Sequence, residues 1–171
     1  MLTSQDNDEG ERVARALLEG SGFAGFAFST HFTLRFSRSK PGSYSGHQLP
    51  AEVELVLRDT WWLGDEAAWR DNVARLAPAG AVEPDEPVQA LELAALRWTT
   101  GTRVESVVVT NGALSVRFEN GRVLTASAEL EEGDTAWSIV AAGEPETKAR
   151  WSVVSEGADL FVRTPQVHGK T

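Results

Sequence analysis

The sequence predicts an α+β protein that is mainly antiparallel, with about eight to ten strands and two or three short helices. Asn-Gly pairs at 111–112 and 120–121 each separate two runs in which apolar and polar residues alternate. This is the strongest short-range signal for a β-hairpin, because type I′ turns need positive φ angles. Helical spacing of apolar residues is confined to short stretches such as Trp69, Val73 and Leu76.

A β pattern that occurs twice is the third observation behind this fold class. The paired segments are 24–36 (AGFAFSTHFTLRF) with 106–118 (SVVVTNGALSVRF), and 53–62 (VELVLRDTWW) with 128–137 (AELEEGDTAW). The first pair ends in Arg-Phe and the second in Asp-Thr-x-Trp, which aligns Trp62 with Trp137. We interpret the pattern as an internal duplication. The alternative is that two amphipathic β segments resemble each other because both follow a period of two.

The duplication predicts how a single domain over residues 1–171 is organised. Its halves are residues 23–77 and 88–163, and the Pro-rich, acidic connector 78–87 joins them. Two meander units would then pair into one strongly curved sheet or a partly closed barrel, an arrangement that removes exposed strand edges.

In the first half, caps and alternation define the elements. We expect disorder over 1–7, a helix over 9–19 that Asp8 caps and Gly20 ends, strands over 23–29, 31–37 and 52–58, and a helix over 66–77 that Asp65 caps. In the second half we expect a helix over 88–96 after Pro87, with a strand over 90–96 as the rival, then strands over 103–110, 113–119, 122–129, 134–141, 150–155 and 159–163, and a loose tail after Pro165.

Composition excludes several classes of protein. The chain has no cysteine, which excludes disulfides and thiolate metal sites. Its net charge of −9 argues against binding to nucleic acids or anionic membranes. We interpret the acidity as a feature that keeps a small domain soluble, and the alternative is a partner with a basic surface. No apolar run is long enough to span a membrane and the first residues do not resemble a signal peptide, so we expect a cytoplasmic protein.

Familiar catalytic motifs are missing from the sequence. The stretch Gly42 to Gly46 has the glycine spacing of a nucleophile elbow, but its central residue is Tyr44 rather than serine. The chain has neither a Gly-rich phosphate loop nor a closely spaced pair of histidines. We therefore expect no cofactor and no metal site.

The segment 37–50 is the best candidate for a binding loop. It is long, rich in glycine and serine, and basic within an acidic chain, because it carries Arg38, Lys40 and His47 together with the single tyrosine, Tyr44. Long loops in compact domains are often functional. We predict either a loop that binds an anion or a partner, or a disordered segment or bare hairpin tip.

Two further pairs of residues follow from the repeat. Trp62 and Trp137 are expected in the core, and the alternative is that they line a pocket for an apolar or cationic ligand. Asp59 and Asp134 precede them by three positions and are expected to close turns. The alternative is that a pseudo-twofold axis brings the two carboxylates together for acid–base chemistry.

The leading functional hypothesis is a noncatalytic protein-interaction module, immunity-like or regulatory. It rests on the acidity, the six tryptophans and the lack of catalytic motifs. One alternative is a barrel-like protein that binds a small apolar ligand in a Trp-lined pocket. A less favoured one is a hydrolase-type enzyme with paired carboxylates. A homodimer through an open sheet face or edge is also compatible with the sequence.

Overall fold

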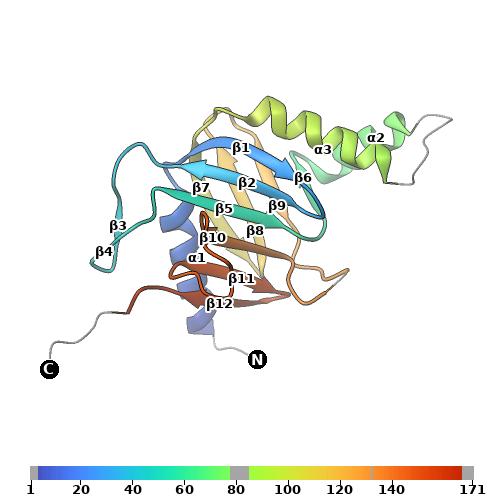
Figure 1. Cartoon of the computed structure of the whole chain (residues 1–171). Coiled ribbons are helices and arrows are strands. Elements are labelled where there is room, and N and C mark those ends of the chain that lie inside the picture. Colours follow the sequence, from blue (N-terminus) through green and yellow to red (C-terminus); the bar gives the residue numbers. More distant parts are fainter. Residues whose placement is uncertain (1–3, 78–84, 132, 167–171) are drawn as a thin grey trace, which may run out of the picture.

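The computed structural model describes residues 4–77, 85–131 and 133–166, which form three helices and two main antiparallel sheets (Figure 1). The helices are α1 (Ser4–Leu18), α2 (Glu66–Leu76) and α3 (Glu86–Thr99). The strands are β1 (Gly22–Phe28), β2 (Phe32–Ser37), β3 (Ser43–Tyr44), β4 (His47–Gln48), β5 (Glu52–Leu57), β6 (Trp61–Leu63), β7 (Val104–Thr110), β8 (Ala113–Phe118), β9 (Val123–Ala126), β10 (Trp137–Ala141), β11 (Ser152–Glu156) and β12 (Asp159–Arg163). The predicted class, α+β with antiparallel sheets, is confirmed.

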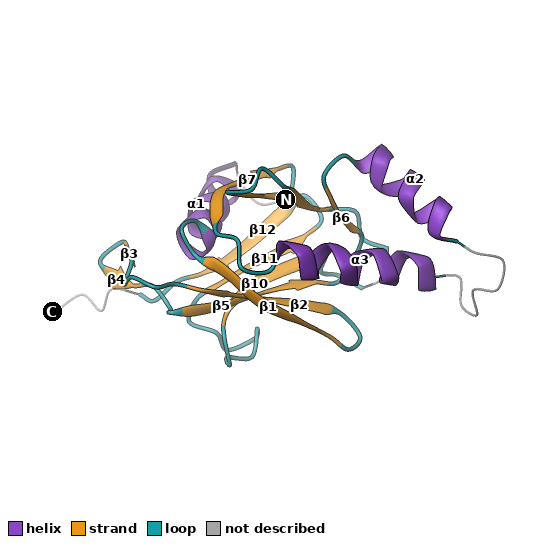
Figure 2. Cartoon of the chain, turned by 90° about the horizontal axis from the view of Figure 1, so that it is seen from above, coloured by secondary structure: helices purple, strands orange, loops and turns teal. Residues whose placement is uncertain are grey.

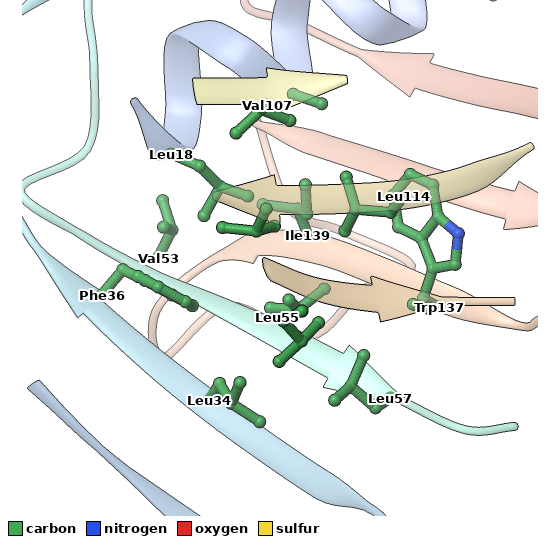
Figure 3. Packing of buried hydrophobic residues seen from close by; sticks show 14 of the residues in the cluster. Leu18, Leu34, Phe36, Val53, Leu55, Leu57, Val107, Leu114, Trp137 and Ile139 are labelled. Atoms are coloured by element: carbon green, nitrogen blue, oxygen red, sulfur yellow. The ribbon is translucent and has the colours of Figure 1, made fainter. Parts of the chain in front are cut away.

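One sheet has six strands in the order β1-β2-β5-β10-β11-β12, and the other has four in the order β6-β9-β8-β7. The strands of the smaller sheet cross behind those of the larger one (Figure 1). The core lies between the sheets, where Leu34, Leu55 and Ile139 of the larger sheet approach Val107 and Leu114 of the smaller one (Figure 3). All five side chains are inaccessible to solvent.

The described strands form two main sheets rather than one strongly curved sheet, and they do not close into a barrel. The edge strand β1 and the start of β7 are joined at one corner, by a bridge between Gly22 and Arg103. The remaining edges, β6 and β12, belong to different sheets. The sheets bury apolar surface by stacking face to face, which is the other common way for antiparallel sheets to form a core.

Each sheet is completed by a strand from the other half of the chain. Strands β1, β2 and β5 form one meander and β7, β8 and β9 form another. The strand that follows the first meander, β6, pairs with β9, and the strand that follows the second, β10, pairs with β5. The two meanders therefore exchange their fourth strands.

The exchange has matching registers. Trp61 lies opposite Ala126 in one sheet, and Trp137 lies opposite Leu57 in the other. Just outside these pairs, the Ser127 N–H donates to the Thr60 carbonyl at 2.9 Å. In the other sheet, just outside the pair of Trp137 and Leu57, the Arg58 N–H donates to the Ala136 carbonyl at 3.0 Å. Trp61 is thus the positional counterpart of Trp137, whereas the sequence alignment had placed Trp62 there.

The sequence alignment of the two halves is wrong from the third strand of each meander onward, because it pairs β5 with a segment that is not a strand. The strand in the place of β5 is β9, while Glu129 and Leu130 lie beyond the end of β9. The first hairpins do correspond, since each has an irregular register, between Phe23 and Gly25 and between Val104 and Ser106, opposite its Arg-Phe pair. The duplication itself remains a prediction, and these correspondences favour it.

The two Asn-Gly turns differ in conformation. Asn111 and Gly112 have φ angles of 49° and 81°, as the tight hairpin between β7 and β8 requires. At the second turn only Gly121 has a positive φ, of 82°. The Asn120 side chain instead accepts a hydrogen bond from the Arg122 N–H at 3.0 Å. The predicted meander is correct, but its second turn is a longer loop.

Helix α1 joins an edge of each sheet. The Asn7 side chain accepts a hydrogen bond from the Leu160 N–H on β12, at 3.0 Å. One turn from the other end of α1, Arg15 Nε donates to the Val107 carbonyl on β7, and Glu19 Oε1 accepts from the Val107 N–H, both at 2.9 Å. These side chains form hydrogen bonds with backbone groups that would otherwise lack a partner at the edge of a sheet.

Several predicted boundaries change. The expected disorder over 1–7 is wrong for residues 4–7, which are helical, and residues 1–3 lie outside the described residues. Residues 86–99 form a helix rather than the rival strand, with Pro87 in the first turn. Most of the predicted connector, 78–84, and the end of the tail, 167–171, lie outside the described residues. Of the described helices, none has the length and apolarity that a membrane crossing requires.

We predict that Gly112→Ala destabilises the fold by about 3 kcal/mol or more. A Cβ at this position would lie 2.0 Å from the Gly157 carbonyl oxygen, in addition to the cost of a positive φ. Gly121→Ala is the matched control, since its φ is 82° but no atom lies within 4 Å of the added Cβ. We expect the control to lose about 1 kcal/mol. Urea denaturation measures both, and equal losses would contradict the close packing of this turn.

Candidate functional site

A pocket of about 420 Å³ lies between β6 and the helical hairpin formed by α2 and α3. The hairpin extends from one side of the stacked sheets, with α2 beside β6 and α3 beside β1 (Figure 2). The pocket is lined by three tryptophans, two valines, one threonine and four charged residues: Trp61, Trp62, Trp69, Val73, Val88, Thr60, Glu66, Arg70, Glu92 and Glu131. This site is hereafter called the Trp pocket.

Strand β6 supplies two of the indole rings. Trp61 is almost fully buried, with its ring centroid 5.5 Å from that of Phe32 and 5.7 Å from that of Trp69. Its neighbour Trp62 is partly buried and packs against the edge of the core. Pairing of β6 with β9 fixes the backbone of both residues. The wall that they form is therefore held in place before any ligand enters.

Helix α2 supplies the third ring. Gly64, with a φ of 84°, turns the chain after β6, and the Asp65 side chain caps the helix by accepting a hydrogen bond from the Ala68 N–H at 2.9 Å. The predicted apolar stripe is confirmed for Trp69 and Val73, which face the core and the pocket. The third member of the stripe, Leu76, is largely exposed.

Helix α3 places a carboxyl group in the Trp pocket. The Glu92 side chain is partly buried, and within the described part of the chain it forms neither a hydrogen bond nor an ion pair. Burial, together with the nearby negative charge of Asp85, raises the pKa of Glu92 to about 7. Near neutral pH this carboxyl group therefore exists in both the protonated and the charged form.

The other charged groups of the pocket have partners. Arg70 donates to Glu66 Oε1, with an Nη2–Oε1 distance of 2.6 Å. The Thr60 hydroxyl donates to Glu131 Oε1 at 2.9 Å. The pocket thus offers aromatic walls and two carboxyl groups without a cationic partner among the described residues, Glu92 and Glu131, of which Glu131 accepts a hydrogen bond from a neutral hydroxyl. These aromatic walls and carboxyl groups can hold an apolar or cationic group.

The predicted binding loop, segment 37–50, is a short hairpin packed against α1. The Arg38 guanidinium donates to the carbonyls of Ala16, Leu17 and Glu19, the nearest at 2.7 Å, and so satisfies the C-terminal end of that helix. Lys40 is exposed. The interpretation of the segment as disordered does not hold, because β3 and β4 pair within it.

Tyr44 and His47 lie against other parts of the fold. The Tyr44 hydroxyl donates to Glu9 Oε1 at 2.8 Å, and its ring packs edge-on against Trp151. His47 lines a separate pocket of about 450 Å³ together with Glu144 and Arg150. Arg150 is paired with Glu144 at 3.5 Å, so the cation of this pocket is already compensated. The four predicted loop residues are not brought together into one site.

Trp62 and Trp137, which the repeat suggests as walls of one pocket, do not line the same pocket. Trp62 lines the Trp pocket, whereas Trp137 is fully buried in the core. The Trp137 indole N–H donates to the Gly112 carbonyl at 2.8 Å (Figure 3 shows the ring). Trp137 therefore ties β10 to the turn between β7 and β8.

Asp59 and Asp134 lie on neighbouring segments, since the Asp59 N–H donates to the Ala136 carbonyl at 3.2 Å. Asp59 is partly buried and Asp134 is exposed. Neither lines the Trp pocket. The paired-carboxylate hypothesis remains a prediction.

Sequence reasoning missed Glu92 and Val88 as site residues. A signal for both was present, because Val88, Glu92 and Leu96 are spaced by four and so share one face of a helix. An acidic residue within an apolar stripe is unusual and marks a candidate site.

Comparison with known protein families, with curated proteins and with solved structures finds no match to this chain. The candidate site therefore rests on its geometry and electrostatics.

We predict that Glu92→Gln stabilises the fold increasingly as the pH rises from 5 to about 7, and that the difference then levels off at about 1–2 kcal/mol up to pH 8.5. The fold raises the pKa of Glu92 from 4.5 to about 7, so the stabilisation from its proton is fully present below about pH 4.5 and is lost as the pH approaches 7. Glutamine keeps the neutral shape at every pH. We expect a stability gain smaller than the full pKa shift implies, because the Glu92 side chain is only partly buried.

Urea denaturation of both proteins across this range measures the difference in unfolding free energy. Glu105→Gln, at an exposed site on β7, is the control and should show no such trend. A difference that does not change with pH would contradict the assignment.

We also predict that Arg38→Ala lowers stability by about 1–3 kcal/mol, because three carbonyls at the end of α1 lose their donor. Lys40→Ala, two positions away and exposed, should change stability by less than about 0.5 kcal/mol. Thermal unfolding compares the two. Equal effects would show that the guanidinium does not hold the helix end.

Proposed function

We propose that this protein binds a small organic molecule in the Trp pocket. The observation that carries the proposal is the convergence of Trp61, Trp62 and Trp69 on one pocket of about 420 Å³. Small-molecule sites are concave, lined mainly by apolar and aromatic side chains, and carry a few polar groups that orient the ligand. The Trp pocket has this composition, with Thr60 and Glu92 as polar groups.

The rigidity of the walls supports binding. Trp61 is packed between Phe32 and Trp69, so a ligand need not order its ring. A ligand that buries about 200 Å² of apolar surface gains about 5 kcal/mol, from which the cost of association is subtracted. Because about 5 kcal/mol is an upper limit, we expect a first, unoptimised probe to bind with a dissociation constant of about 0.2 mM at the tightest.

The interaction-module hypothesis remains a prediction with one feature in its favour. Trp98 on α3 is 67% exposed, and Leu93 on the same helix is 42% exposed. Exposed apolar side chains of this size are candidates for contact with another protein, and the net charge of −9 favours a basic one.

Titration with N-phenyl-1-naphthylamine, a neutral dye that becomes fluorescent in apolar surroundings, tests the ligand-binding proposal. We expect saturable binding that weakens at least fivefold in Trp62→Ala, which removes part of the wall. Val73→Trp, which fills the pocket, should weaken it further. Trp98→Ala is the matched control, because its ring is exposed and does not line the pocket, and it should bind like the natural chain.

Circular dichroism establishes that each variant is folded before it is compared. Absence of saturable binding would contradict the proposal. Equal binding by the natural chain, Trp62→Ala and Val73→Trp would contradict it as well, because the dye would then bind elsewhere.

A further inference from the structure

The charges that line the Trp pocket are unbalanced. Three carboxyl groups, from Glu66, Glu92 and Glu131, face it together with one cation, Arg70. Arg70 is engaged by Glu66, so its charge is not available to Glu92. A carboxylate taken out of water without a cation is costly. The raised pKa of Glu92 is the expected response to that cost.

The aromatic walls favour the same sign of charge on a ligand. The face of an indole ring carries partial negative charge, and tryptophan is the side chain that attracts cations most strongly through its ring. Trp61, Trp62 and Trp69 all line the pocket that contains Glu92. A positive group on the ligand would be stabilised by the rings and the carboxylate together, and an anion would be repelled by both.

We propose that the ligand of the Trp pocket is an organic cation, an ammonium group on an apolar body, whose charge lies against Glu92. The inference rests on the proposed function and specifies its ligand class. The apolar body would contact the indole rings and Val73, and the ammonium group would supply the positive partner that Glu92 lacks among the described residues.

Binding of a cation should compete with the proton on Glu92. The affinity should therefore rise as the pH passes through about 7, where the carboxyl group ionises. The other charged groups around it are Glu66 and Arg70 on α2, Asp85 at the start of α3, and Glu131 in the segment before β10.

Calorimetric titration with three probes of similar shape tests the charge preference: benzyltrimethylammonium, benzyl alcohol and phenylacetate. The first is positive at every pH, so any pH dependence comes from the protein. At pH 8 we expect it to bind at least tenfold more tightly than benzyl alcohol, with phenylacetate weakest. At pH 5.5 the advantage over benzyl alcohol should fall to threefold or less.

Two variants locate the charge. Glu92→Gln should lose the tenfold preference for the cation over benzyl alcohol at pH 8. Glu105→Gln removes the same charge from an exposed site on β7 and should keep the preference. The pH series on the natural chain tests the same point without any substitution.

The outcomes separate this inference from the proposed function. If benzyl alcohol or the neutral dye binds in a Trp62-dependent way but the cation has no advantage at pH 8, the protein binds small molecules and the cation inference is wrong. The inference is also wrong if Glu92→Gln retains the preference. If no probe binds in a Trp62-dependent way, the proposed function fails together with it.

Discussion

The fold depends on the reciprocal exchange of β6 and β10 between the two meanders. Without β10, strand β5 would be an open edge in the middle of the six-stranded sheet, and without β6, strand β9 would be an open edge of the smaller one. The exchanged strands also carry the two most deeply placed β-strand tryptophans, Trp61 and Trp137. The same pairing that completes the sheets therefore also anchors them to each other.

The position of the Trp pocket is a consequence of this exchange. Strand β6 is short and lies at the edge of the smaller sheet, so no further strand of that sheet pairs with its outer side. The chain turns at Gly64 and returns α2 against the same edge, and α3 then packs on α2 and on β1. On the opposite side of the fold, α1 covers the edges of β7 and β12. One pair of edges is thus closed by hydrogen bonds, whereas β6 is covered by a helical hairpin with a pocket beneath it.

Local patterns of the sequence predicted local structure well. Alternation identified the strands, Asn111-Gly112 identified a tight turn, and the spacing of Trp69 and Val73 identified the inner face of α2. The pairing of β5 with β10 was not predictable, because a period of two shows which residues share a face but not which strand lies alongside. The Arg-Phe pairs of the repeat mark equivalent hairpins, but the shared Asp-Thr-x-Trp spacing aligns Trp137 with Trp62, whereas strand pairing makes Trp61 its counterpart.

The candidate site was predicted less well for a related reason. Segment 37–50 was singled out for its basic residues, but Arg38 is committed to the end of α1 and Tyr44 to Glu9. The sequence alone does not distinguish a charged side chain that caps a distant helix from one that binds a ligand. Conversely, the spacing that places Glu92 on the apolar face of α3 is visible in the sequence, but the raised pKa of Glu92 arises from its burial and from the nearby charge of Asp85, which only the folded structure shows.

The exchanged strands also constrain the order in which the molecule can form. Leu57 on β5 pairs with Trp137 on β10, about 80 positions further along the chain. The centre of the larger sheet therefore forms only after β10 has come into contact with β5. Pairings this distant slow folding and leave strand edges exposed in the meantime. A net charge of −9 on every molecule opposes contact between two half-folded chains, because like charges repel.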